Sequence, residues 1–297
     1  MAVATSLDPQ VPPRGGNNRA KGDAFSAQPR HDLGMNPLEQ AGYFEVSGAH
    51  LYTVLHGVAD PVARVLLVGS FASERHFSYL PWVRWARYLA ARGIESLRFD
   101  YRGIGESTGV FENMSFDNWI EDVELLAGWL KSRSPDVPLI LHGLELGAVL
   151  AGNVFETGLG DALLLWAPPA SANEALRTTL LRRIALNNMF KYGDERKPAS
   201  DYLRQLESGA FLEVDGYRWS SRLWHDSFRY ELPPCGRDEG GAEYKRPVRT
   251  VPLDKHAAPL IKGSSVGYDT INRDFGELFA DNFAWLATQV TVRGRQC

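Results

Sequence analysis

Short apolar runs alternate with segments of helical periodicity along the middle of the chain. Four runs predict strands: 63–70 (ARVLLVGS), 95–101 (ESLRFDY), 137–142 (VPLILH) and 162–167 (ALLLWA). Between them, three segments carry apolar residues at helical spacing or almost throughout: 80–92, 119–130 with Ser115 as N-cap, and 146–155. This alternation predicts an α/β fold, with a mainly parallel sheet, run 137–142 near its centre and helices on both faces.

The two ends of the chain depart from this alternation. Runs 42–46 and 51–57 predict an antiparallel edge that leads into the sheet. Residues 168–232 hold two helical stretches, 175–192 and 199–209, with no strand between them, and this predicts a helical cap. Run 248–253 is the last predicted strand, and an apolar face over 275–290 predicts a C-terminal helix.

Composition and charge limit the classes of protein to which this chain can belong. Residues 1–40 are rich in Pro, Gly and polar side chains, so they are predicted to be a disordered tail before a single domain at 41–297. The net charge of -4 argues against a nucleic-acid partner. No segment reaches the roughly 18 apolar residues of a membrane span, and no signal peptide is evident. The two cysteines indicate neither a disulfide framework nor a metal site, so a cytoplasmic protein is expected, and the oligomeric state stays open.

The chemistry-bearing motif is HGLELGAVLAG at residues 142–152, where a predicted strand turns sharply into an apolar helix. Its frame is G-x-x-x-G, from Gly143 to Gly147, with Glu145 at the centre. The N–H groups and dipole of the helix favour an ionised carboxylate there. Such a carboxylate can act as a nucleophile, forming an ester that water then hydrolyses. Alternatively, Glu145 is a polar residue at a turn that does no chemistry.

A second motif, GESTG at residues 105–109, matches G-x-S-x-G around Ser107. A polar stretch follows it instead of an immediate buried helix, so Ser107 is not expected to be a nucleophile. Asp100 and Arg102 are expected to brace this turn. A dinucleotide fingerprint is also disfavoured, because Thr108 stands where its third glycine would be.

The strand VPLILH, the turn GLELG and the apolar helix together resemble the nucleophile elbow of the α/β-hydrolase fold. The stretch from VLLVGS to YRGIGES is similar to serine aminopeptidase-like hydrolases, including those associated with exosortase systems. The resemblance covers residues 63–168 well and the rest loosely. It implies hydrolysis of an ester, thioester or amide. The elbow residue of this superfamily is usually Ser, and Asp in the dehalogenase and epoxide hydrolase branches, so Glu145 departs from the pattern.

The resemblance also implies the partners of the elbow residue. The backbone N–H groups of Phe71 and Leu146 would form the oxyanion hole. His256, just after the last predicted strand, takes the place of the base. The acid would lie between Glu145 and His256, and Asp238, with Glu239 beside it, has the right order. His142 precedes the elbow glycine, where the superfamily often has a histidine that is not the base, and His225 falls in the cap.

Two functions therefore stay open. In one, the protein is a hydrolase in which Glu145 is nucleophile or base and His256 activates water. In the other, it is a non-catalytic member of the fold that binds a small acyl or peptide-like ligand under the cap, or serves as a partner protein. Residues 235–244 contain no strand-like run to carry the acid, which is the strongest sequence argument for lost catalysis. Neither function implies a metal or an organic cofactor.

Overall fold

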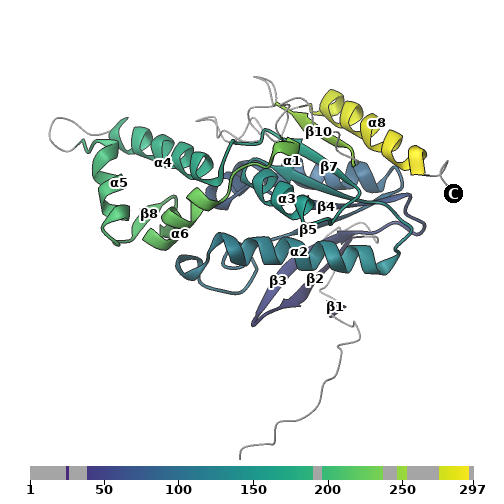
Figure 1. The fold of residues 1–297 in the computed structure, drawn as a ribbon, viewed down its shortest axis with the longest axis horizontal. Helices are drawn as coiled ribbons and strands as arrows, with labels where there is room; N and C mark the ends of the chain where they lie inside the picture. The colour runs from purple at the N-terminus through teal and green to yellow at the C-terminus, as the bar shows by residue number, and fades with distance from the viewer. Residues whose placement is uncertain (1–24, 27–38, 190–195, 237–245, 253–273, 294–297) are drawn as a thin grey trace, which may run out of the picture.

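The predicted parallel sheet is present at the centre of the molecule (Figure 1). The computed structural model describes residues 25–26, 39–189, 196–236, 246–252 and 274–293. Within them the main sheet has the order β1-β2-β3-β5-β4-β6-β7-β10. Its strands are β1 (Phe25–Ser26), β2 (Glu39–Val46), β3 (Ala49–His56), β4 (Ala63–Val68), β5 (Ile94–Phe99), β6 (Leu139–Leu144), β7 (Ala162–Trp166) and β10 (Val248–Val251).

Strands β5, β4, β6, β7 and β10 are parallel. Strands β2 and β3 form the antiparallel edge that the sequence predicted, and β1 adds to it a strand that was not predicted. Strand β6 lies between β4 and β7, and all six of its residues are buried. Its central position is therefore confirmed, and it explains why VPLILH is apolar on both faces.

Helices cover both faces of the sheet. Alternate strand residues divide the core into two clusters, as Leu66 and Val65 of β4 show by belonging to different ones. Helices α2 (Phe116–Arg133) and α3 (Leu146–Glu156) pack in the first cluster. Helices α1 (Ala72–Ala90) and α8 (Gly276–Arg293) pack in the second. No helix among the described segments is long and apolar enough to cross a membrane.

Helix α2 begins at the predicted cap. The Ser115 hydroxyl accepts a hydrogen bond from the Asn118 backbone N–H at 3.4 Å, and the Asn118 side chain accepts one from the Ser115 N–H at 3.0 Å. This reciprocal pair satisfies N–H groups that the first turn of a helix leaves without partners.

The cap is mainly helical, as predicted, but it also contains a hairpin that the sequence analysis omitted. Its helices are α4 (Ala172–Met189), α5 (Ala199–Glu207) and α6 (Ser221–Asp226). Between α5 and α6, strands β8 (Leu212–Val214) and β9 (Tyr217–Trp219) pair antiparallel. Asp215 and Gly216 join them with φ of 51° and 85°. An Asp-Gly pair with positive φ at both positions makes the tight turn that two short strands need.

The boundary of the N-terminal tail differs from the prediction. Strand β2 begins at Glu39, inside the range 1–40, and Phe25 and Ser26 pair with Phe44 and Tyr43 of β2. The polar start of β2 gave no strand signal. Tertiary contacts stabilise it instead, because the Glu39 carboxylate accepts hydrogen bonds of 2.6 and 3.1 Å from Arg87 of α1.

Candidate active site

The elbow lies at the carboxyl end of β6, where Glu145 joins the strand to α3. Its φ of 54° and ψ of −123° are strained for a residue with a side chain. The flanking glycines are required by close packing. A Cβ on Gly143 would lie 2.3 Å from the Ala148 Cα atom, and one on Gly147 would lie 2.2 Å from the Val68 carbonyl oxygen. The G-x-x-x-G spacing therefore reflects how closely α3 approaches the sheet.

The Glu145 carboxyl is buried, and the residue is 8% exposed. Its pKa is raised to about 8, mainly by burial and in part by the nearby Glu74 carboxyl, whereas the N–H groups of Leu146 and Phe71 and the Arg182 charge oppose the shift. Its Oε2 atom has no hydrogen bond to the described part of the chain. The helix N–H groups favour the ionised form, as expected, but desolvation outweighs them and raises the pKa of the carboxyl above its usual range.

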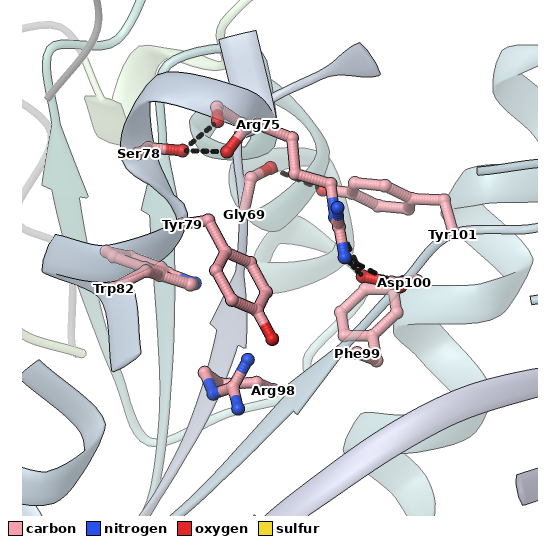
Figure 2. A pocket seen from close by; sticks show the side chains of 10 residues that line it. Gly69, Arg75, Ser78, Tyr79, Trp82, Arg98, Phe99, Asp100 and Tyr101 are labelled. Carbon is pink, nitrogen blue, oxygen red and sulfur yellow. Dashed lines mark hydrogen bonds and ion pairs between the residues drawn. The ribbon is translucent and has the colours of Figure 1, made fainter. Parts of the chain in front are cut away.

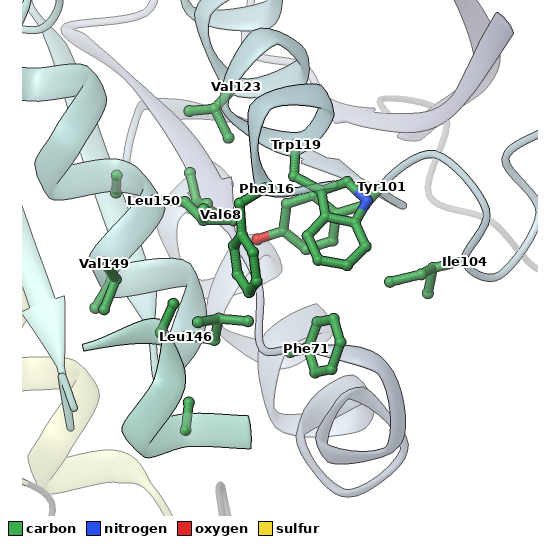
Figure 3. Close-up of a cluster of buried hydrophobic side chains, with 14 of the residues drawn as sticks. Val68, Phe71, Tyr101, Ile104, Phe116, Trp119, Val123, Leu146, Val149 and Leu150 are labelled. Atoms are coloured by element: carbon green, nitrogen blue, oxygen red, sulfur yellow. The ribbon is translucent and has the colours of Figure 1, made fainter. Parts of the chain in front are cut away.

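The two backbone groups proposed for the oxyanion hole come together at this carboxyl. Phe71 is the N-cap of α1, and Leu146 is the first residue of α3. The N–H group of each forms a hydrogen bond that stabilises the charged form of Glu145. Figure 3 shows the Phe71 and Leu146 side chains in the same cluster of buried apolar residues. Chain order was enough to pair them because β4 and β6 are adjacent and parallel.

Glu74 is a site residue that the sequence analysis missed. It lies in the first turn of α1 and is 4% exposed. Its carboxyl accepts a hydrogen bond of 3.2 Å from the Thr179 hydroxyl and forms an ion pair with Arg182, both on α4 of the cap. Burial raises the pKa of Glu74, and the Arg182 charge opposes that shift. Its partners are about a hundred residues away in sequence, so no local pattern could have revealed it.

Ser107 serves the turn in which it lies, as predicted. Its hydroxyl donates to the Asp100 carbonyl oxygen at 2.5 Å and accepts from the Tyr52 N–H at 2.8 Å. The Asp100 carboxylate accepts bonds of 2.9 and 2.8 Å from the Arg75 guanidinium (Figure 2) and one of 3.0 Å from the Glu106 N–H. Arg102 pairs with Asp122 of α2. The Ser107 hydroxyl therefore forms hydrogen bonds with two backbone groups and is not positioned to act as a nucleophile.

Neither His142 nor His225 supplies a base at the elbow. His142 is fully buried, its Nδ1 atom accepts a hydrogen bond of 3.0 Å from Trp85, and burial lowers its pKa well below the usual range. It is a neutral core residue, which agrees with the role expected for it. His225 lies on the exposed side of α6.

The predicted base His256 and the predicted acid Asp238, with its neighbour Glu239, lie outside the described residues. Strand β10 is hydrogen bonded directly to β7, with Val248 opposite Leu163, so no further strand lies between them. Among the described residues, no group of His, Cys, Asp and Glu side chains could hold a metal ion.

The parallel sheet, the strained strand–turn–helix junction and the cap define an α/β-hydrolase fold, and the resemblance found in the sequence is confirmed. The model of a family described as serine aminopeptidase, S33, matches residues 78–213, which is less than half of the chain. No match was found among curated proteins.

Several α/β hydrolases are among the similar solved structures. The chain is 15% identical to the α/β hydrolase GrgF from Penicillium sp. sh18, with a TM-score of 0.56, and the match covers 85% of this chain and 99% of GrgF. It is 14% identical to a monoglyceride lipase from Saccharomyces cerevisiae, with a TM-score of 0.53 and coverage of 88% and 99%. A lidless serine hydrolase from Xanthomonas campestris is 23% identical, with a TM-score of 0.39, and the chain spans 65% of its length while 47% of this chain is covered. At these identities the likeness establishes the fold alone.

Proposed function

We propose that this protein binds a small acyl or peptide-like ligand beneath its cap, and that Glu145 contacts the ligand without attacking it. In this function the α/β-hydrolase fold supplies a shaped site, and the elbow residue supplies a polar group within it. Function has to be argued from the site, because this fold does not set a single chemistry.

The state of the Glu145 carboxyl carries this proposal. With a pKa of about 8, the group is mostly protonated at neutral pH, and a protonated carboxylic acid is a poor nucleophile. The same carboxyl engages the N–H groups of Phe71 and Leu146. A substrate oxyanion would need those donors at close range, so the elbow side chain competes with the transition state that the hole would stabilise.

A second candidate function is hydrolysis of an ester, thioester or amide by Glu145 with His256 and an acid. The raised pKa favours it in one respect, since a carboxyl that titrates near neutrality is suited to general acid–base work. In this case Glu145 would move a proton rather than form a covalent ester.

Chemical probes distinguish the two functions. A fluorophosphonate, which labels activated serines, is expected to leave the native protein unmodified because Glu145 occupies the elbow and Ser107 is engaged with backbone. Short-chain aryl esters and thioesters are expected to be hydrolysed no faster by the native protein than by Glu145→Ala. Hydrolysis that disappears in both Glu145→Ala and His256→Ala would instead establish the enzyme.

The Glu145→Ser variant provides the complementary measurement. Serine is weak without a base, so labelling of this variant requires a base and an oxyanion hole that are already in place. We expect no labelling. Labelling at residue 145 would show surviving machinery and favour a hydrolase with an exchanged elbow residue, and labelling of the native chain at Ser107 would contradict both functions.

A further inference from the structure

A pocket of about 470 Å³ separates the start of α1 from the cap. The first turns of α1 line one side, and the second half of α4 and the β8–β9 hairpin line the other. This volume is within the range of roughly 300–1,000 Å³ typical of small-molecule sites. Two of its lining residues, Ala72 and Ser73, directly follow Phe71 in the chain, so the pocket begins next to the backbone that contacts Glu145.

The charged side chains of this pocket are mostly basic. Arg75, Arg182 and Arg183 line it, and Asp215 is the acidic residue in its wall. Arg182 divides its guanidinium between Asp215, at 3.3 Å, and Glu74, which is buried behind the wall. Three guanidinium groups and one carboxylate therefore line the pocket, and the arginines are paired with Asp100, Glu74 and Asp215.

Two of these arginines keep donors for a ligand. Arg75 uses Nε and Nη2 for Asp100, and its Nη1 atom makes no hydrogen bond to the described residues. The Arg183 side chain is 41% exposed, and its pairing with Asp215 is a single contact of 3.4 Å. Guanidinium groups in this state are suited to carboxylate or phosphate oxygens, which they bind with paired, charge-assisted hydrogen bonds.

The remaining walls combine apolar and aromatic side chains with the polar side chains of Ser73 and His76. Leu186 of α4 is 40% exposed, and the Phe77 ring lies 5.5 Å below the Arg182 guanidinium. Tyr217 of the hairpin closes another side. Apolar surface beside guanidinium groups with free donors favours a ligand that has both an anionic group and an apolar part.

We infer that this pocket binds a small organic anion, with a carboxylate or phosphate head at Arg75 and Arg183 and an apolar body against Leu186 and Phe77. The inference rests on the proposed ligand-binding function and names the chemical class of its ligand. It requires no covalent step and no cofactor.

Titration calorimetry with the full chain tests the charge requirement. The probes are octanoate, octyl phosphate and the neutral ester methyl octanoate, at low and high salt. We expect one of the two anions to bind at least tenfold more tightly than the ester, and its affinity to fall with salt because exposed charges are screened. The better anion identifies a carboxylate or a phosphate head.

Paired variants test the location. Arg183→Gln is expected to weaken binding of the anion by roughly tenfold, since a hydrogen bond to a charged group is lost. Arg204→Gln, at a side chain that is 75% exposed on α5 and absent from the pocket, is the matched control and should bind normally. Equal binding by native protein and Arg183→Gln would overturn the location.

The outcomes separate this inference from the function on which it rests. If the neutral ester binds as tightly as the better of the two anions, the ligand-binding function stands and the anionic class of ligand is wrong. If none of the three probes binds, both fail. If Glu145-dependent hydrolysis is found, titration of Glu145→Ala with the same probes still decides whether the pocket prefers an anion.

Discussion

At the scale of single residues, the main finding is a carboxyl group whose charge is set by burial. Two backbone N–H groups and the helix dipole stabilise the ionised form of Glu145. The free-energy cost of removing that charge from water is larger than this stabilisation. Burial also disfavours the charged form of His142, but for a histidine this lowers the pKa, so the imidazole stays neutral. Both groups at this end of β6 are therefore uncharged at neutral pH.

The unfolding free energy should reveal the shift at Glu145. Its pKa is about 8 in the folded protein and near 4.5 when unfolded, so the folded state holds the proton more tightly. The native protein should therefore lose stability relative to Glu145→Gln as pH rises from 4.5 to 8, and no further above 8. The total change is on the order of a few kcal/mol. Urea unfolding across this range measures it, with Glu207→Gln at an exposed position as the control.

A constant difference between native protein and Glu145→Gln across pH 4.5–8 would contradict the raised pKa. It would also remove the main objection to a carboxylate nucleophile. This single residue thus links the stability of the protein to the choice between its two candidate functions.

At the scale of elements, the elbow depends on how closely α3 approaches β4 and β6. Gly147 lies against the backbone of Val68 and Gly69, and a Cβ there would lie within 2.3 Å of both carbonyl oxygens. Backbone atoms cannot move aside as a flexible side chain can. The position of Glu145 above the sheet therefore depends on this glycine.

Gly147→Ala is expected to destabilise the protein by about 3 kcal/mol or more, because it overpacks a buried helix–sheet contact. Gly128→Ala is a matched control in the middle of α2, where nothing lies within 4 Å of the added Cβ. That variant should gain about 0.5–1 kcal/mol from helix propensity. Thermal unfolding of both variants measures the contrast, and equal effects would show that the approach of α3 is looser than described.

At the scale of the whole molecule, a short chain of charges joins the cap to the core. Arg182 of α4 pairs with Glu74 of α1 and with Asp215 of the cap hairpin. Thr179, one turn earlier on α4, donates to the same Glu74 carboxyl. The contact fixes the cap over the pocket, and it leaves a buried carboxyl dependent on a partner from another element.

Arg182→Met should therefore destabilise the protein by about 2–3 kcal/mol. This is less than the loss expected when one partner of a fully buried ion pair is removed, because the Arg182 side chain is 23% exposed. Adding Glu74→Gln should restore part of that loss, since no buried charge is then left unpaired. Arg204→Met, at an exposed surface pair, should change stability by less than about 0.5 kcal/mol. If the double variant is as unstable as the sum of the single ones, the pair does not hold the cap.

The sequence by itself determined the class of fold and the position of the elbow. Strands such as β6 are apolar because both of their faces are buried, and the apolar surface of α3 follows from its packing on them. The glycine spacing around Glu145 marks the close contact between the two. The Ser115 cap could also be predicted, because it depends on neighbours near in the chain.

Only the tertiary structure decided which residues surround Glu145 and how they shift its pKa. The raised pKa of Glu145 depends on burial by distant segments, which no local stretch of sequence reports. Glu74 becomes a site residue through Thr179 and Arg182, and the start of β2 is stabilised by Arg87 of α1. The local pattern of apolar residues indicates which residues are buried. Ion pairs between residues a hundred positions apart, and the cost of removing a carboxylate from water, arise only when the chain has folded.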